Sequence, residues 1–156
     1  MKLKFLFVSI MLLSLYGASG YHYDEYQPVF MDRENLEKSV FYLETDRELN
    51  NPGKIYCLGN YIFVNEKYKG VHVYNNTNPE NPVKQGFIFA PGCIDMAVKD
   101  SILYLDNSVD LVAFDLATRQ PVKRIINVFP EPLSPSGDHH WGNRPANHIL
   151  IEWRKR

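Results

Sequence analysis

The chain is poor in the features that identify most enzymes and nucleic-acid-binding proteins. Its 156 residues contain 17 Lys and Arg against 18 Asp and Glu, for a formal net charge of −1. Because there is no basic field to attract phosphates, nucleic acid is not an expected partner. The sequence also lacks a Gly-x-Ser-x-Gly elbow, a glycine-rich phosphate-binding loop and the dense acidic loop that binds calcium. We therefore expect no cofactor and no enzymatic activity.

Cysteine is rare, with only Cys57 and Cys93 present. Neither belongs to a Cys-x-x-Cys pair or has zinc-type spacing, so no zinc site is expected. In an exported chain the two cysteines could form one disulfide. Both also lie in or beside predicted strands, where buried free thiols are common. The sequence leaves both interpretations open.

The apolar run over residues 5–16 is shorter than the roughly 20 residues that span a bilayer. Lys2 and Lys4 precede this run, and Ala18-Ser19-Gly20 follows it with small residues. This order is typical of a secretory signal peptide. We therefore predict that residues 1–20 are a signal peptide and that the exported chain has no transmembrane span. A single membrane anchor is the alternative interpretation.

The histidines do not define a metal site. Asp138, His139 and His140 are consecutive, and His148 lies nearby. Adjacent residues of an extended chain point to opposite sides, so they rarely bind one ion, and no third ligand has a defined spacing. We predict no metal-binding residue.

Reactive side chains are also scattered through the second half of the chain. Acidic residues at turns and strand ends commonly cap backbone N–H groups; the candidates are Asp95, Asp106, Asp110 and Asp115. Serines without the hydrolase elbow are not expected nucleophiles; they are Ser101, Ser108, Ser134 and Ser136. We predict no catalytic or cofactor-binding residue, and the ligand-binding residues stay undetermined.

Residues 21–52 form a leader with one short helix. Residues 21–30 are aromatic and polar, and are expected to be an extended leader or a strand lying on the domain. A helix is expected over residues 33–41, because Asp32 can cap its first turn and apolar side chains recur along one face. The Asn-Asn-Pro-Gly turn at residues 50–53 then separates the leader from the strand-rich region that begins at Gly53.

What the sequence does contain is β-type sequence, arranged as a degenerate internal repeat. Residues 59–65 align with 100–106, residues 70–75 with 110–115, and residues 82–84 with 121–123. A period of about 40 residues is typical of propeller blades. Each unit predicts four short strands, which is one blade. The two units cover about 53–89 and 93–129, and the last predicted strand of the second unit is residues 122–129.

The remaining residues, 130–156, have a different character. Pro130, Pro132, Pro135 and Gly137 interrupt regular structure. A last strand is expected over residues 147–153, where apolar residues alternate. We interpret residues 130–156 as a proline-rich linker followed by a terminal strand.

Both units resemble LVIVD repeats, a propeller-like family found in exported proteins of Bacteroidetes. The first unit matches the blade pattern of that family at residues 59–64, 70–75 and 78–83, while the second has Asp100 and Asp110 in place of two glycines. The resemblance implies an all-β, mainly antiparallel fold, with two propeller-like four-stranded blades plus a short N-terminal helix. Two blades make an incomplete propeller, because closed propellers take about four to eight.

The predicted signal peptide, the repeat and the lack of a catalytic constellation together suggest a function. They indicate a non-enzymatic binding or scaffold module of the bacterial cell envelope, in the periplasm or at the cell surface, with a protein or glycan partner. The lipid anchor common in the family is not expected, because Ala18 stands where the lipidated cysteine would be. Two alternatives remain: a fragment of an envelope enzyme of the glycan-processing class, and a non-functional truncated product.

Overall fold

The computed structural model describes residues 25–45, 47–137 and 143–156. The elements in chain order are β1 (Tyr26–Asp32), α2 (Arg33–Glu37), β2 (Phe41–Leu43), β3 (Pro52–Leu58), β4 (Tyr61–Glu66), β5 (Gly70–Asn75), β6 (Val83–Phe89), β7 (Met96–Lys99), β8 (Ile102–Asn107), β9 (Asp110–Asp115), β10 (Gln120–Ile125) and β11 (His148–Lys155). The predicted all-β, mainly antiparallel class is confirmed. The predicted signal peptide, residues 1–20, and the consecutive residues Asp138, His139 and His140 lie outside the described residues.

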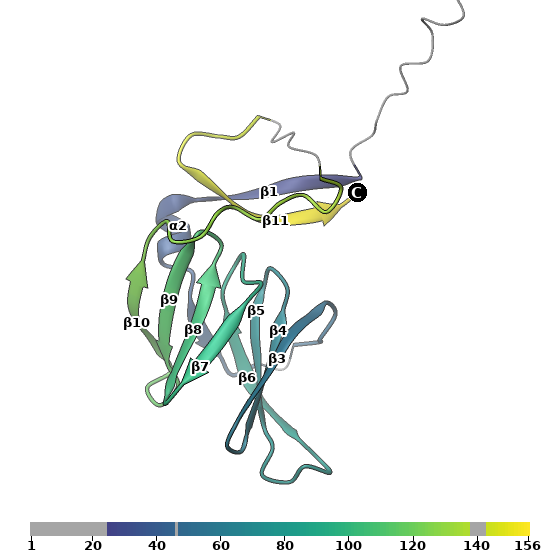
Figure 1. The fold of residues 1–156 in the computed structure, drawn as a ribbon, viewed down its shortest axis with the longest axis vertical. Helices are drawn as coiled ribbons and strands as arrows, with labels where there is room; N and C mark the ends of the chain where they lie inside the picture. The colour runs from purple at the N-terminus through teal and green to yellow at the C-terminus, as the bar shows by residue number, and fades with distance from the viewer. Residues whose placement is uncertain (1–24, 46, 138–142) are drawn as a thin grey trace, which may run out of the picture.

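The strands form three antiparallel sheets, none of them closed on itself. β3, β4, β5 and β6 follow one another as a meander, and β2 pairs with the free side of β6. β7, β8, β9 and β10 form a second meander. The third sheet is the antiparallel pair of β1 and β11. Figure 1 shows the two meanders side by side, with the β1–β11 pair across one end of both.

Short hairpin turns set the register of both meanders. Gly59 and Asn60 connect β3 to β4, and Asp100 and Ser101 connect β7 to β8. The first residue of each turn has a left-handed backbone, with φ of 54° at Gly59 and 56° at Asp100. Glycine adopts this conformation without cost and aspartate tolerates it better than most residues. The turn at Asp100 therefore forms although its glycine is missing.

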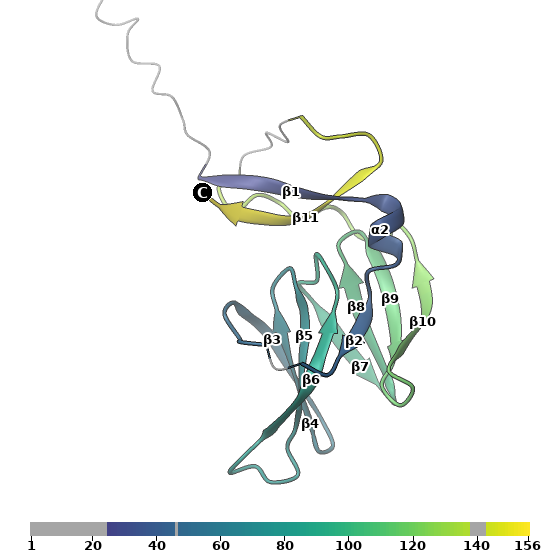
Figure 2. The same ribbon diagram turned by 180° about the vertical axis from the view of Figure 1, so that it is seen from behind.

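The helix is shorter than predicted. The sequence predicted residues 33–41, whereas α2 ends after five residues. Its predicted start is correct, because the Asp32 carboxylate accepts hydrogen bonds from two backbone N–H groups of the first turn. The helix cannot continue to residue 41 because Phe41 is already paired with Phe89 in the first meander. Figure 2 shows β2 running from α2 along the side of β6.

The last strand of the second meander is also shorter than the predicted range of residues 122–129. β10 ends at Ile125. The backbone N–H groups of Val128 and Phe129 both donate to the Val109 carbonyl, at 2.7 and 2.9 Å. The chain has therefore turned back over the β8–β9 turn instead of extending along β9.

The hydrophobic core lies between the two meanders. Strand alternation turns one face of each sheet toward the other. Phe63 and Val73 lie opposite each other in the first meander, and Leu103 and Phe114 do so in the second. All four side chains are buried in one apolar cluster. Each meander thus covers the apolar face that the other cannot cover alone.

Asp110 joins the N-terminal helix to the second meander. Its carboxylate is fully buried and both oxygens lie 2.9 Å from Arg33 Nη2. Arg124 Nη1 donates to Asp110 at 2.7 Å, and the Asn127 N–H donates to it at 3.0 Å. Arg124 also donates to the Leu36 carbonyl of α2 at 3.2 Å. The sequence predicted only backbone capping at Asp110, whereas the structure adds two charged partners.

Removing the charge of Asp110 should therefore destabilise the fold strongly. In Asp110→Asn the guanidinium groups of Arg33 and Arg124 both lose their buried carboxylate partner, while Arg33 keeps Glu37 at 2.8 Å. Breaking a buried ion pair costs about 3 kcal/mol or more. The free energy of unfolding, measured by urea denaturation, is the test. Asp115→Asn is the matched control, because an asparagine can still cap the turn after β9, and it should cost under about 0.5 kcal/mol. Equal losses in the two variants would contradict the assigned role of Asp110.

Candidate functional site

The acidic residues noted in the sequence make structural contacts, and Asp95 and Asp106 are neighbours. Asp106 accepts hydrogen bonds from the N–H groups of Ile94 and Asp95, each at 2.9 Å, and its burial raises its pKa. Asp95 pairs with Lys54 at 2.8 Å, and this contact lowers the pKa of Asp95. Asp115 accepts from two backbone N–H groups of the turn that follows it. The prediction that these carboxylates accept from backbone N–H groups is confirmed for all four, because Asp95 also accepts from the Met96 N–H at 2.7 Å and Asp110 from the Asn127 N–H at 3.0 Å.

The serines and the described histidine of the C-terminal segment are equally dispersed. Ser108 donates to a carbonyl of β11 at 2.5 Å, and the hydroxyls of Ser134 and Ser136 lie 2.9 Å apart. His148 Nδ1 lies 2.8 Å from a nearby backbone carbonyl. Ser101 lies in the β7–β8 turn. Over residues 25–45, 47–137 and 143–156, no three His, Cys, Asp or Glu side chains gather to hold a metal ion.

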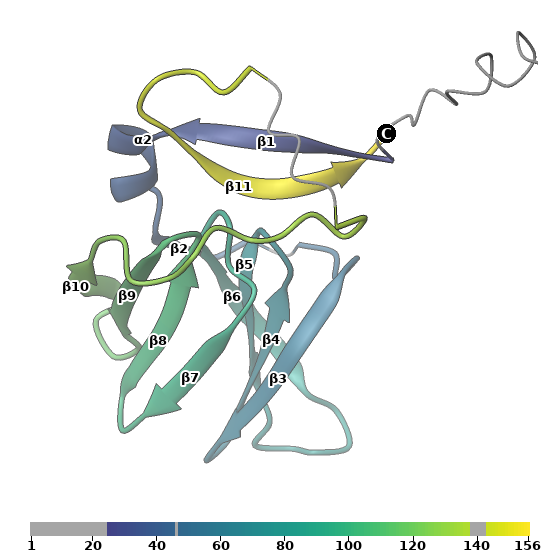
Figure 3. The same cartoon turned by 45° about the horizontal axis from the view of Figure 1, so that its top comes forward.

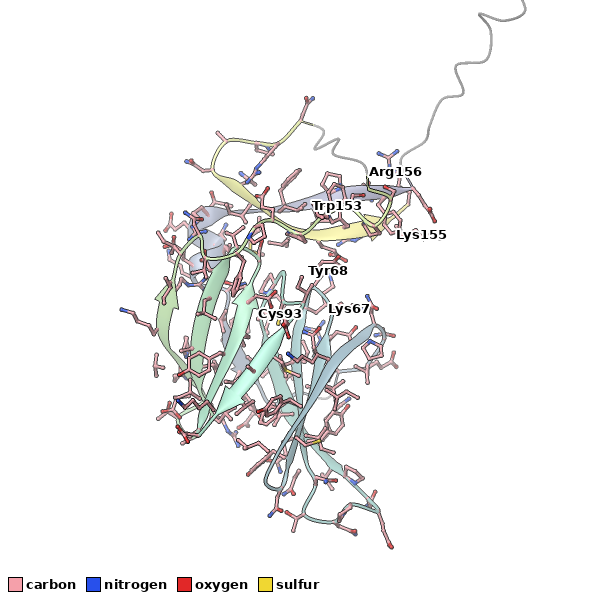
Figure 4. All side chains as sticks on the ribbon, in the orientation of Figure 1. Lys67, Tyr68, Cys93, Trp153, Lys155 and Arg156 are labelled. Atoms are coloured by element: carbon pink, nitrogen blue, oxygen red, sulfur yellow. The ribbon has the colours of Figure 1, made fainter. Side chains whose placement is uncertain are left out.

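The two cysteines are free, and their environments differ. Cys57 is exposed on β3, whereas Cys93 is fully buried. Cys93 Sγ lies 3.3 Å from Asn65 Nδ2, and burial beside Asp106 raises the pKa of the thiol well above its ordinary value. Figure 4 places Cys93 between the ends of the meanders, below Tyr68 and the β1–β11 pair. Of the two interpretations left open by the sequence, the structure shows free thiols.

The difference in burial predicts different reactivity. A thiol reagent such as 5,5′-dithiobis(2-nitrobenzoate) should modify one thiol per chain in the native protein and two in denaturant, because buried, protonated thiols react poorly. Cys57→Ser should abolish the native reaction, and Cys93→Ser should leave it unchanged. If no thiol reacts in denaturant without a reducing agent, the cysteines are disulfide-bonded and the assignment is wrong.

His72 is a buried histidine that no sequence pattern singled out. It lies on β5, on the face of the first meander that is turned away from the core, and its ring packs against Phe87 at 4.7 Å. Its Nε2 is 3.4 Å from Glu66, but within the described residues neither ring nitrogen has a hydrogen-bond partner. Burial lowers the pKa of His72, and Glu66 only partly offsets this effect. The N–H groups of Asn50 and Asn51 donate to Glu66, and the Arg47 guanidinium carbon lies 4.7 Å from the centre of the Phe87 ring, so residues 47–51 lie on this face of the meander.

A lowered histidine pKa makes stability depend on pH. As pH falls through the ordinary histidine value of 6.5, the unfolded chain gains a proton at His72 that the folded chain does not. Stability should therefore fall between pH 6.5 and the lower folded pKa. His72→Phe keeps an aromatic ring but has no titrating nitrogen. Between pH 7.5 and 5.5, its free energy of unfolding, measured by urea denaturation, should therefore fall less than that of the wild-type protein.

His148→Gln is the control for that comparison, because the His148 ring is part-exposed and close to a backbone carbonyl. It should keep the pH dependence of the wild-type protein. If His72→Phe loses as much stability on acidification as the wild type, His72 does not cause the dependence.

A cleft lies between the two meanders at the end formed by the β3–β4, β7–β8 and β9–β10 turns. In Figure 1 these turns are at the lower end of the meanders. We call this cleft the inter-sheet cleft, and its volume is about 440 Å³. Its floor is apolar and consists of Leu58, Phe63, Val73, Phe114 and Leu116. Its rim is polar and consists of Tyr42, Gly59, Asn60, Tyr61, Gln85, Asp100, Ser101, Ala117 and Arg119. The cleft thus combines a buried apolar surface with hydrogen-bonding groups at its mouth.

Tyr42 and Arg119 organise one side of that mouth. The Arg119 guanidinium carbon lies 4.6 Å from the centre of the Tyr42 ring, and Nη1 pairs with Glu44 at 2.7 Å. Tyr42 donates its hydroxyl to the Gln85 carbonyl at 3.0 Å. Burial raises the pKa of Tyr42, and Arg119 opposes that shift in part. The phenol therefore stays protonated at neutral pH, and its hydroxyl proton is already donated to the Gln85 carbonyl.

Sequence reasoning missed this site. Tyr42 comes from the leader and Arg119 from the β9–β10 turn, so no short motif contains both. Arg119 has a left-handed backbone, with φ of 57°, which marks it as a turn residue and nothing more. Of the residues noted in the sequence, Asp100 and Ser101 lie on the rim, as turn residues rather than as catalytic groups.

A second hollow, the outer groove, lies beside β7 and β8 and under residues 129–133. Its volume is about 570 Å³. Tyr104 and Leu133 remain 37% and 71% exposed there. Trp153 of β11 holds residues 129–133 in place by donating to the Pro132 carbonyl at 2.8 Å. The corresponding far face of the first meander is covered by residues 47–51, so the two far faces differ.

Comparison of the chain with protein-family models, curated proteins and solved structures found no match in any of the three. The resemblance to LVIVD repeats therefore stays a prediction. In the part of the chain that the structure describes, no helix has the length and apolar character needed to span a bilayer.

Proposed function

We propose that this protein is a non-enzymatic, exported binding module of the bacterial cell envelope, built from LVIVD-type β repeats. The inter-sheet cleft is the observation that carries the proposal. Ligand pockets are typically concave and mostly apolar, with a few placed polar groups and about 300–1,000 Å³ of volume. The cleft has these properties. The reactive residues noted in the sequence lie on separate elements and make structural contacts, which favours binding over catalysis.

We also infer that the two meanders are propeller-type blades. Each has four antiparallel strands in chain order, and the apolar faces of the two pack together. β3 contacts β7, and β2 contacts β10, so the edges of the two sheets meet on both sides. α2 and the β1–β11 pair lie across one end of both meanders (Figure 3). This arrangement supports a two-blade unit with a cap.

An exported module of this kind would bind a protein or a glycan of the envelope. The rim of the inter-sheet cleft is formed by the turns β3–β4, β7–β8 and β9–β10. Turn residues on a rigid sheet scaffold are where binding groups are commonly placed. A protruding side chain or a single sugar unit would fit the size of the cleft.

Capture from envelope extract tests the proposal. The immobilised protein should retain a partner, and Ala117→Trp, which fills the mouth of the inter-sheet cleft, should reduce the captured amount at least about tenfold. Ala97→Trp is the matched control, because Ala97 is also an exposed alanine but lines the outer groove. It should capture as much partner as the wild type.

Two outcomes would overturn the proposal. If Ala117→Trp captures the partner as well as the wild type does, the inter-sheet cleft is not the binding site. If no partner is captured and the protein turns over an envelope glycan, the enzyme alternative replaces the binding module.

A further inference from the structure

The charge at the mouth of the inter-sheet cleft indicates which small ligand it suits. Among the described residues that line the cleft, the charged ones are Arg119 and Asp100. Arg119 is held from one side, because its guanidinium carbon lies over the Tyr42 ring, 4.6 Å from the ring centre. Stacking leaves the edge of a guanidinium free to donate to a planar anion. The mouth therefore presents a positioned cationic donor above an apolar floor.

The present partner of Arg119 shows what fits at that edge. The Glu44 carboxylate lies 2.7 Å from Arg119 Nη1, with 78% of the Glu44 side chain exposed. Arg119 itself is 45% exposed. Exposed ion pairs contribute little because water screens them. A ligand carboxylate that also buries an apolar body would replace Glu44 at little cost.

The apolar floor of the cleft indicates the chemistry of the rest of the ligand. Leu58 and Leu116, one from each meander, contribute apolar surface that is still partly exposed, beside the buried Phe63 and Phe114. Burial of apolar surface is the main source of affinity in such a site. Asp100 on the rim disfavours a second anionic group, because like charges repel. The ligand would therefore carry one carboxylate.

We propose that the inter-sheet cleft binds a small amphipathic monocarboxylate. Its apolar or aromatic body lies against Leu58 and Leu116, and its carboxylate takes the place of Glu44 at Arg119. This inference rests on the proposed function, in that it takes the inter-sheet cleft as the binding site, and it adds the chemical class of a small ligand.

Titration of the exported protein with 4-phenylbutyrate and with its neutral amide tests the inference. Binding is followed by calorimetry and by amide chemical shifts. 4-Phenylbutyrate should bind about tenfold or more tightly than the amide, because only the carboxylate pairs with Arg119. Arg119→Gln should remove this preference and leave the amide unaffected. Arg154→Gln, an exposed arginine on β11, is the matched control and should preserve it.

A second variant acts in the opposite direction. Glu44→Gln removes the competing carboxylate and should tighten 4-phenylbutyrate binding several-fold, with no effect on the amide. Because the Glu44 side chain is mostly exposed, this change leaves the packing of the sheets intact. A rise in affinity for Glu44→Gln together with a loss for Arg119→Gln is the expected pair of results.

The outcomes separate the inference from the proposed function. If the amide binds as well as the carboxylate, with shifts at the cleft, the carboxylate inference is wrong and the cleft remains a binding site. If neither compound binds, or if Arg119→Gln keeps the preference, the inference is also wrong. The envelope-capture experiment then decides the proposed function independently. If Ala97→Trp rather than Ala117→Trp blocks binding, the site is the outer groove. Both the carboxylate inference and the assignment of the inter-sheet cleft as the binding site are then overturned.

Discussion

The contact between the apolar faces of the two meanders is the interaction on which the structure depends. A four-stranded sheet cannot cover its own apolar face. Phe63 and Phe114 are therefore buried only because each sheet packs against the other. The leader strengthens this contact at two places. β2 widens the first meander, and α2 is held against the second by Asp110 and its two arginines. The N-terminal and C-terminal halves of the described chain are therefore mutually dependent.

The inter-sheet cleft is a consequence of the same packing. At the end of the core, the partly exposed Leu58 and Leu116 line the cleft beside the buried Phe63 and Phe114, so its floor is apolar. The rim is built from hairpin turns, which favour glycine, asparagine, aspartate and serine for conformational reasons. An apolar floor under a polar rim thus results from strand and turn chemistry. Arg119 and Tyr42 add to it a positioned charge, because the leader strand β2 brings Tyr42 to the end of the β9–β10 turn.

Much of the secondary structure could be predicted from residues close together in the sequence. Strand alternation separates Val71 and Val73, which face the core, from His72 on the opposite face. The helix cap at Asp32 and the turns at Gly59 and Asp100 could be predicted from the sequence in the same way. The lengths of the helix and of β10 were less predictable. The helix is followed by β2, which pairs with the distant strand β6, and β10 is followed by a turn whose N–H groups donate to the Val109 carbonyl. The repeat itself and its assignment to a family stay predictions.

The site could not be predicted, because its residues come from segments that meet only after the sheets pack. Tyr42 and Arg119 are 77 positions apart, and no local pattern marks them as partners. By itself the sequence determined where strands, turns and the helix cap form, since these depend on neighbours a few residues away. Only the tertiary structure decided which face of each sheet is buried against which, that Cys93 is shielded while Cys57 is exposed, and that Arg119 and Tyr42 share one cleft. Those outcomes depend on contacts between distant segments, and such contacts exist only once the two meanders have closed on each other.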